Sequence, residues 1–325
     1  MSNAIRRALP ALTLLLLAPV LGELVSVHQS PLEFINPLNF LLLSLPYGFG
    51  ALVCRELLVR WKKGWPSLLL LGIAYGIYEE GAVVYSLFDP NWNELGSMAQ
   101  YGYAAGVNWT WGLMTIHFHA LVSIGASVMI AELLFPGRRG EPWLGKLGLI
   151  GCFAGLLLWA PALGWIAITY MGRPFPPLGW YAAAWLAVPA LGWEASRVPA
   201  APLAPLRRKP PRPVFFFLLG LADMTLFFFT VSLTADHGWP PLPVTVVALL
   251  ALDAAALWLA LRWSGNGVSW DDRHRLALFA GFLGFFIYFG FDQDLDAFQG
   301  SSLVSILAIA ALWRLGRMVK RRNGG

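Results

Sequence analysis

PVFFFLLGLADMTLFFFTVSLT, residues 213–234, is an apolar run with one ionisable side chain, that of Asp223. A run of this length crosses the hydrocarbon core of a bilayer as an α-helix, which needs about 20 mostly apolar residues. Its phenylalanines and leucines recur on every face, so no side of such a helix is suited to water. The stretch therefore predicts a transmembrane helix, and similar runs recur along the chain.

The composition of the whole chain is that of a membrane protein. Of its 325 residues, 58% are hydrophobic and 13% are charged, and the mean hydropathy is +0.61. Soluble domains are typically about one quarter charged. The apolar runs are long and uninterrupted, unlike the alternating strands of about ten residues that build outer-membrane barrels, so they favour helices.

Runs of about 18 or more mostly apolar residues predict about ten transmembrane helices. They lie at about 9–27, 34–59, 65–88, 106–135, 146–170, 177–195, 213–234, 242–262, 274–291 and 300–318. The predicted fold class is all-α, a polytopic integral membrane protein whose residues 1–325 form a single membrane domain. A cytoplasmic linker rich in Pro and Arg, 196–213, separates a six-helix half (about 9–195) from a four-helix half (about 213–318).

The basic residues predict the orientation, because Lys and Arg collect in cytoplasmic loops. With the N-terminus inside, 22 of the 23 Lys and Arg residues fall on the cytoplasmic side and only Arg173 falls outside. We therefore expect both termini in the cytoplasm and a location in the plasma membrane. Arg6 and Arg7 before a leucine-rich run also resemble a signal peptide, but no small-x-small cleavage site follows cleanly, which favours a retained helix.

Because the basic residues lie in short loops between apolar runs, they indicate topology and not a nucleic-acid surface. The expected partners are membrane lipids, and the sequence leaves the oligomeric state open.

Ionisable residues inside the predicted helices mark a candidate site. Glu79 and Glu80 fall in the third helix, and His117 and His119 fall in the fourth. Such groups cost about 2.5–3.5 kcal/mol at a helix centre, so they tend to face a cavity and to be functional. The glutamates lie about nine residues from the outer end and the histidines about eleven to thirteen, which at about 1.5 Å per residue is nearly the same depth.

Helical geometry limits how these four residues can meet. Adjacent residues on an α-helix point about 100° apart, and residues two apart point about 200° apart. We therefore expect Glu79 and His119 to face the bundle interior, with Glu80 and His117 as supporting or alternative ligands. The predicted catalytic residues are Glu79, Glu80 and His119. The predicted ligands of a divalent metal cofactor are Glu79, His117 and His119.

The segment Tyr78-Glu79-Glu80-Gly81-Ala82-Val83-Val84, followed by histidines on the next helix, resembles the CAAX-protease-like intramembrane metalloproteases. In that family a Glu-Glu-x-x-x-Arg helix and later histidines activate a water, with Glu as the base. The resemblance covers two of the predicted helices. Val84 stands where the motif has arginine, Thr115 stands where phenylalanine would precede His119 by four, and no later helix offers the His-x-x-x-Asn/Asp pattern.

Two further acids, Asp223 and Asp253, fall near mid-membrane on consecutive helices and could face each other as a proton-sharing pair. They favour an alternative function, a proton- or cation-coupled transporter of a small solute or lipid. A third alternative is a non-catalytic membrane scaffold in which a protonated Glu and a His join two helices by hydrogen bonds. The leading interpretation is a membrane-embedded hydrolase that acts on a lipid or membrane peptide through the Glu/His cluster.

Overall fold

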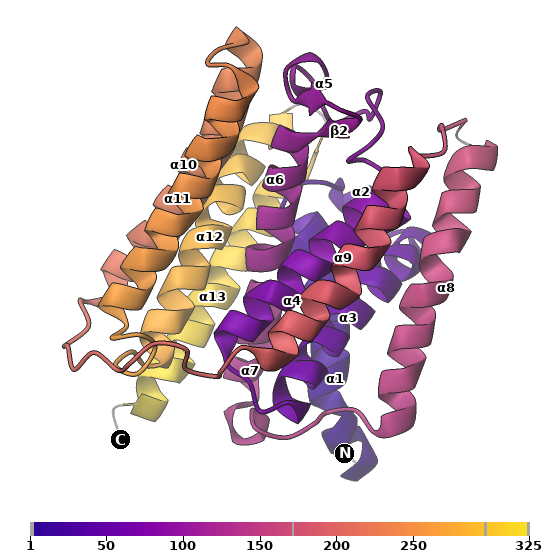
Figure 1. Ribbon diagram of the computed structural model, residues 1–325. Helices are drawn as coiled ribbons and strands as arrows, with labels where there is room; N and C mark the ends of the chain where they lie inside the picture. The colour runs from indigo at the N-terminus through magenta and orange to yellow at the C-terminus, as the bar shows by residue number, and fades with distance from the viewer. Residues whose placement is uncertain (1–2, 171, 296–297, 324–325) are drawn as a thin grey trace.

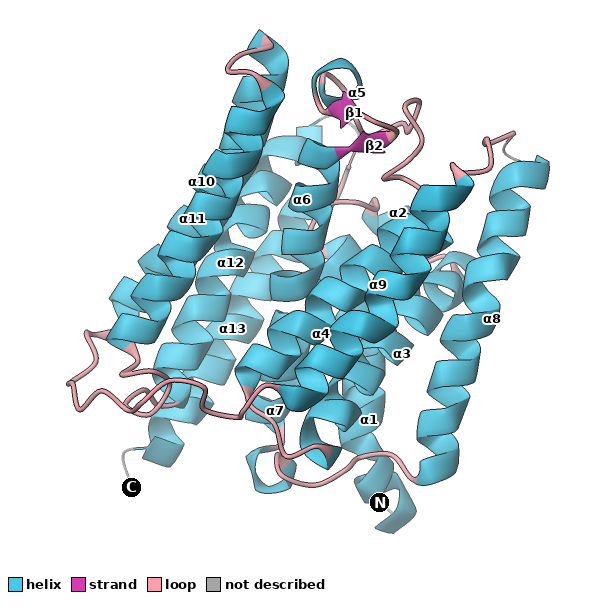
Figure 2. Ribbon diagram, viewed as in Figure 1, coloured by secondary structure: helices cyan, strands magenta, loops and turns pink. Residues whose placement is uncertain are grey.

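The computed structural model describes residues 3–170, 172–295 and 298–323, and these residues form a bundle of long helices (Figure 1). Helices account for nearly all regular structure, and the strands among the described residues are two-residue elements in one small hairpin (Figure 2). The elements in chain order are α1 (Asn3–Pro19), η1 (Val20–Leu24), α2 (Pro31–Phe34), α3 (Pro37–Arg60), α4 (Trp65–Ile77), η2 (Tyr78–Val83), α5 (Met98–Tyr101), β1 (Tyr103–Ala104), β2 (Val107–Asn108), α6 (Trp109–Phe118), η3 (His119–Ala126), α7 (Ser127–Leu134), η4 (Pro136–Arg138), α8 (Lys146–Tyr170), α9 (Leu178–Arg197), α10 (Pro213–His237), α11 (Leu242–Trp263), α12 (Asp272–Asp292), η5 (Gln293–Leu295) and α13 (Ser301–Asn323).

The all-α membrane fold predicted from the sequence is confirmed. Each of the ten predicted segments contains a helix, and eight helices among the described residues are long and apolar enough to cross a bilayer. The two others are α9 and the continuous α4–η2 helix, which are not among those eight. In the third segment the helix ends at Val83, before the predicted 88, and Tyr85 then adopts a left-handed φ of 64° in the turn that follows.

The helix formed by α6, η3 and α7 runs through the centre of the bundle. Its apolar window is 72% buried, against 11% for α11, so it is a core helix and not a lipid-facing one. Ile124 and Val128 belong to the core cluster shared with α1, α3 and α4, whereas Val122 and Ile130 belong to the cluster shared with α10, α12 and α13. The two halves of the chain therefore both pack against this helix.

The outer helices turn large apolar side chains away from the core. Leu158 of α8, Val247 of α11 and Leu307 of α13 are each at least 60% exposed. In a bilayer such a surface contacts lipid. The start of α1 and the end of α13 lie at the same end of the bundle, and the hairpin with α5 lies at the opposite end (Figure 1). We call these the terminal end and the hairpin end.

Candidate functional site

Three π-helical segments interrupt the long helices, and each carries candidate site residues. Glu23 lies in η1, Glu79 and Glu80 lie in η2, and His119 is the first residue of η3. The wide turns are visible in backbone hydrogen bonds from Val84 N to Glu79 O (3.0 Å) and from Val25 N to Val20 O (2.8 Å), each spanning five residues. Single π-turns inside α-helices occur frequently at functional sites.

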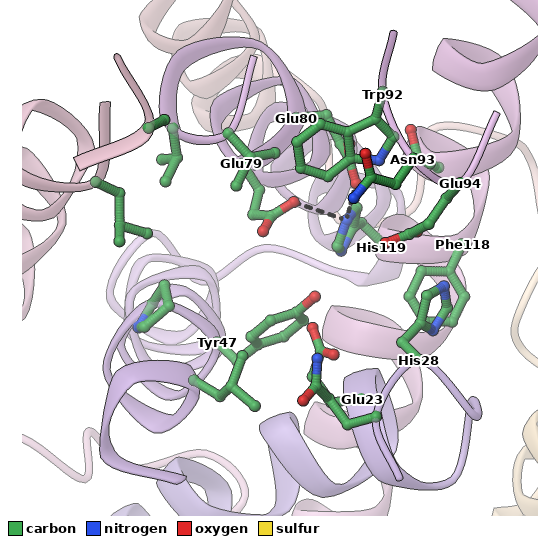
Figure 3. Close-up of a pocket in the computed structure, with 18 of the residues that line it drawn as sticks. Glu23, His28, Tyr47, Glu79, Glu80, Trp92, Asn93, Glu94, Phe118 and His119 are labelled. Carbon is green, nitrogen blue, oxygen red and sulfur yellow. Dashed lines mark hydrogen bonds and ion pairs between the residues drawn. The ribbon is translucent and has the colours of Figure 1, made fainter. Parts of the chain in front are cut away.

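Glu79, Glu80 and His119 form a compact cluster. His119 Nε2 lies 3.0 Å from Glu80 Oε1 and 3.3 Å from Glu79 Oε2. One donor atom from each of the three residues lies within 4.8 Å of the other two. The imidazole nitrogen thus faces both carboxylates at once, in a region where all three side chains are nearly shielded from solvent (Figure 3).

The sequence-based geometry placed Glu79 toward the bundle interior and Glu80 as a supporting or alternative ligand, whereas in the structure both glutamates contact His119. It assumed that neighbouring side chains point about 100° apart, as in an α-helix. Glu79 and Glu80 lie instead in the π-helical η2, whose wider turn brings consecutive side chains closer in direction. The sequence-based geometry failed here because it assigned a regular α-helix to this segment.

Hydrogen bonds from neighbouring side chains orient His119 and Glu80. His119 Nδ1 lies 3.0 Å from Ser123 Oγ, which orients the ring so that Nε2 faces the glutamates. The Ser86 hydroxyl donates to Glu80 Oε2, and the Trp111 indole donates to Ser86 Oγ at 2.9 Å. Such supporting bonds around ligating side chains are typical of metal sites. Of these three residues, the sequence offered a signal for Ser123, four residues after His119 on one helix face, and for Ser86, seven residues after Glu79.

Two glycines allow the helices that carry the cluster to approach closely. A Cβ atom on Gly72 would lie 2.8 Å from Ala120 Cα, and one on Gly76 would lie 3.0 Å from Ile116 Cα. Small residues spaced by four let membrane helices pack backbone to backbone. The Gly72–Gly76 pair therefore seats α4 against α6 and η3, just before the chain reaches Glu79.

The cluster lies on the wall of a cavity of about 430 Å³. Glu23 and Tyr47, whose side chains hydrogen-bond to each other, lie on the opposite wall (Figure 3). His28 also lines the cavity, and its Nδ1 lies 2.8 Å from Ser26 Oγ. Further lining comes from the hairpin-end loop residues Trp92, Asn93, Glu94 and Arg173, and from apolar residues of α3 and α8.

Glu94 adds a fourth carboxyl to this cavity, and the sequence analysis missed it as a site residue. Its carboxyl points inward from the loop (Figure 3). Loss of hydration in the cavity, with repulsion from Glu80 and Glu79, raises the pKa of Glu94 to about 7, although Arg173 opposes this. Four glutamates therefore surround one cavity, a concentration of negative charge that suits a bound cation.

The structure places His117 in a second cluster and not beside Glu79, as the predicted metal ligand set required. His117 Nδ1 lies 2.8 Å from Asp253 Oδ1, and Nε2 lies 3.4 Å from Asp223 Oδ2. The reason is the rotation of about 200° between residues two apart on a helix, which turns His117 away from the side that His119 faces. The sequence did group Asp223 with Asp253, and their carboxylate oxygens come within 4.8 Å of each other.

Three comparisons with known proteins bear on this arrangement. No curated protein and no solved structure shows significant similarity to the chain. A sequence model of a protein family matches residues 12–291, a range that includes both clusters. With most of its length matched, this chain belongs to an uncharacterized membrane protein family.

Proposed function

We propose that the protein is a membrane-embedded, metal-dependent hydrolase whose reaction centre is Glu79, Glu80 and His119. The observation that supports this proposal most strongly is the convergence of three π-helical segments, which bring these side chains and Glu23 to one buried cavity. A clamp that only joined two helices would need one Glu and one His. It would need neither the additional carboxylates nor the cavity.

The spacing of the donor atoms fits a shared divalent ion. Two donors each about 2.1 Å from a metal lie about 3.0 Å apart at a right angle and about 3.4 Å apart at the tetrahedral angle. The separations of 3.0 and 3.3 Å from His119 Nε2 to the two carboxylates fall in this range. Glu79, Glu80 and His119 would hold the ion at the wall of the cavity. A bound divalent ion would polarise a carbonyl group and make water more acidic.

Other side chains orient the cluster and accept the proton of the attacking water. Ser123 fixes the orientation of the His119 ring, and Ser86 fixes that of the Glu80 carboxylate. We assign Glu23, on the opposite wall beside Tyr47, the role of accepting the proton of the attacking water. The hydroxyl adds to the carbonyl carbon, the ester or amide bond breaks, and the proton passes to the leaving group.

The lining of the cavity indicates the class of substrate. Leu42 and Leu43 of α3 and Leu163 and Ile166 of α8 line it, and the outward faces of both helices carry exposed apolar side chains. A lipid ester or a membrane peptide could enter from the bilayer between such surfaces. For the same protein we propose a plasma-membrane location with cytoplasmic termini, which reporter fusions to the C-terminus would test.

The test is a hydrolysis assay on protein reconstituted in liposomes with fluorogenic lipid esters and a quenched membrane-peptide reporter, in the presence of Zn²⁺ or Mn²⁺. We expect turnover in the wild type and a loss of at least about 100-fold in Glu80→Gln and in His119→Gln. The matched controls are Glu141→Gln and His237→Gln, which change exposed residues outside the cavity. Equal turnover in all five proteins would contradict the proposal, and so would its absence from the wild type on both substrate classes.

A further inference from the structure

The second cluster, formed by His117, Asp223 and Asp253, lies on the wall of a larger cavity of about 940 Å³. This cavity lies between α4, the α6–η3–α7 helix and helices α10 to α12. Lys62, Lys63 and Arg139 line it at the terminal end, whereas the first cavity is lined by residues of the hairpin end. It is therefore a separate space with its own polar group deep in the bundle.

One ring nitrogen of His117 has a close partner, and the other has no hydrogen bond among the described residues. Its Nδ1 lies 2.8 Å from Asp253 Oδ1, and its ring stacks on Phe227 with centroids 4.1 Å apart and planes 9° apart. Nε2, in a side chain that is 4% exposed, has no hydrogen-bond partner among the described residues. A buried imidazole nitrogen without a partner costs free energy unless something binds it.

The nearest charged atom to that nitrogen stands at a distance that fits metal coordination better than a hydrogen bond. Asp223 Oδ2 lies 3.4 Å from His117 Nε2, and Asp223 is itself 7% exposed. Two donors about 2.1 Å from one tetrahedral ion are separated by about 3.4 Å. An imidazole whose other nitrogen meets a carboxylate is the usual arrangement around a metal-bound histidine.

We propose that His117 Nε2 and Asp223 form a second site for a divalent transition metal of the Zn²⁺ class, independent of the Glu79–Glu80–His119 cluster. Asp253 positions the imidazole ring through Nδ1. Its side chain is 39% exposed and lines the cavity, and its carboxylate is also close enough to supply a third donor. The open positions of the ion face the 940 Å³ cavity, where water or a ligand group completes the coordination.

The charge balance supports this assignment. Two aspartates inside membrane helices are costly when ionised and unpaired, and one imidazole cannot compensate both. A divalent ion held between them offsets both charges and satisfies Nε2 at the same time. The same ion would join α6 to α10 and α11, and so would connect the two halves of the chain.

The experiment measures Zn²⁺ alone, by equilibrium dialysis and elemental analysis of the full-length protein in detergent. We expect about two Zn²⁺ per chain in the wild type and one in Asp223→Asn, which is an isosteric change. His119→Gln should also bind one, because it retains the second site. His237→Gln, at an exposed histidine, should bind two.

The outcomes separate the two proposals. If Asp223→Asn loses one equivalent and His119→Gln loses none, the second site stands and the first metal centre fails. If Asp223→Asn binds as much Zn²⁺ as the wild type, the second site is overturned. Should Asp223→Asn unfold, His117→Gln is the replacement, and visible absorption of Co²⁺-loaded protein reports whether an imidazole ligand has been lost.

Discussion

His117 and His119 stand two residues apart on the central helix and face different acidic clusters. His119 Nε2 lies 3.0 Å from Glu80 Oε1, whereas His117 Nδ1 lies 2.8 Å from Asp253 Oδ1. One helix thus separates two cavities, one lined from the hairpin end and the other from the terminal end.

Ser123→Ala removes the group that faces His119 Nδ1 at 3.0 Å. The ring then loses its fixed orientation, so we expect Zn²⁺ to bind the first cluster about 10–100-fold more weakly. Competition with a fluorescent chelator measures the dissociation constant. Ser127→Ala is the matched control, since that buried hydroxyl lies one turn further along and has no hydrogen-bond partner among the described residues. The same loss of affinity in both variants would contradict the role of Ser123.

Gly72→Ala places a methyl group where a Cβ would lie 2.8 Å from Ala120 Cα. Overpacking of this kind typically costs about 1–3 kcal/mol, so we expect a lower thermal midpoint and weaker metal binding, because α4 must move away from η3. Thermal unfolding in detergent measures the first effect. Gly151→Ala on α8, where nothing lies within 4 Å, should leave the midpoint unchanged or slightly higher. A drop of equal size there would show that the close contact with Ala120 is not responsible for the loss at Gly72.

Glu56→Ala removes the acceptor of a buried network at the terminal end. Glu56 accepts from Trp143 N at 2.6 Å and pairs with Arg55 at 3.1 Å, and both charged side chains are 0% exposed. Arg55 then keeps only Glu132, at 3.6 Å, as a carboxylate partner among the described residues, so we expect the change to cost about 3 kcal/mol in the free energy of unfolding. Glu141→Ala breaks an exposed pair with Arg138 and should cost less than about 1 kcal/mol. Chemical denaturation of the two variants measures both losses in the free energy of unfolding, and equal losses would contradict the role of the buried pair.

Glu94→Gln should raise stability at high pH and have a smaller effect at low pH. The pKa of Glu94 is raised from 4.5 to about 7 by loss of hydration and by its glutamate neighbours. The folded state therefore keeps its proton where the unfolded state has lost it, so the wild type loses stability as pH rises from about 4.5 to 7. With chelator present, we expect the variant to unfold at a higher temperature than the wild type at pH 8, with a smaller difference at pH 5. A difference independent of pH would contradict the shifted pKa.

Most of the fold could be predicted from the sequence. Long apolar runs such as 213–234 predict helices in a bilayer, because every backbone group must form its hydrogen bond within the protein there. Hydropathy could not predict that the third helix ends at Val83, because the residues that follow are also apolar. A left-handed turn at Tyr85 ends the helix there. Hydropathy also gave no reason to expect η1, η2 and η3, since an apolar run reads the same whether its turns are α-helical or π-helical.

The contact between Glu79 and His119 could be predicted from their depth in the membrane. Glu79 and His119 lie at one level of consecutive helices, and the structure brings them within 3.3 Å. The partner of His117 could not be assigned, because Asp223 and Asp253 lie more than a hundred residues further along the chain. Glu94 was missed since nothing in the loop sequence shows that its carboxyl points into the cavity.

The metal content of purified wild-type protein, compared by mass spectrometry with that of the Glu79→Gln/His119→Ala double variant, tests the first cluster most directly. We expect near-stoichiometric divalent metal at this cluster in the wild type and the loss of one equivalent in the double variant. His237→Ala should match the wild type. A wild type without bound metal, or a double variant that retains all of it, would contradict a metal centre at Glu79, Glu80 and His119.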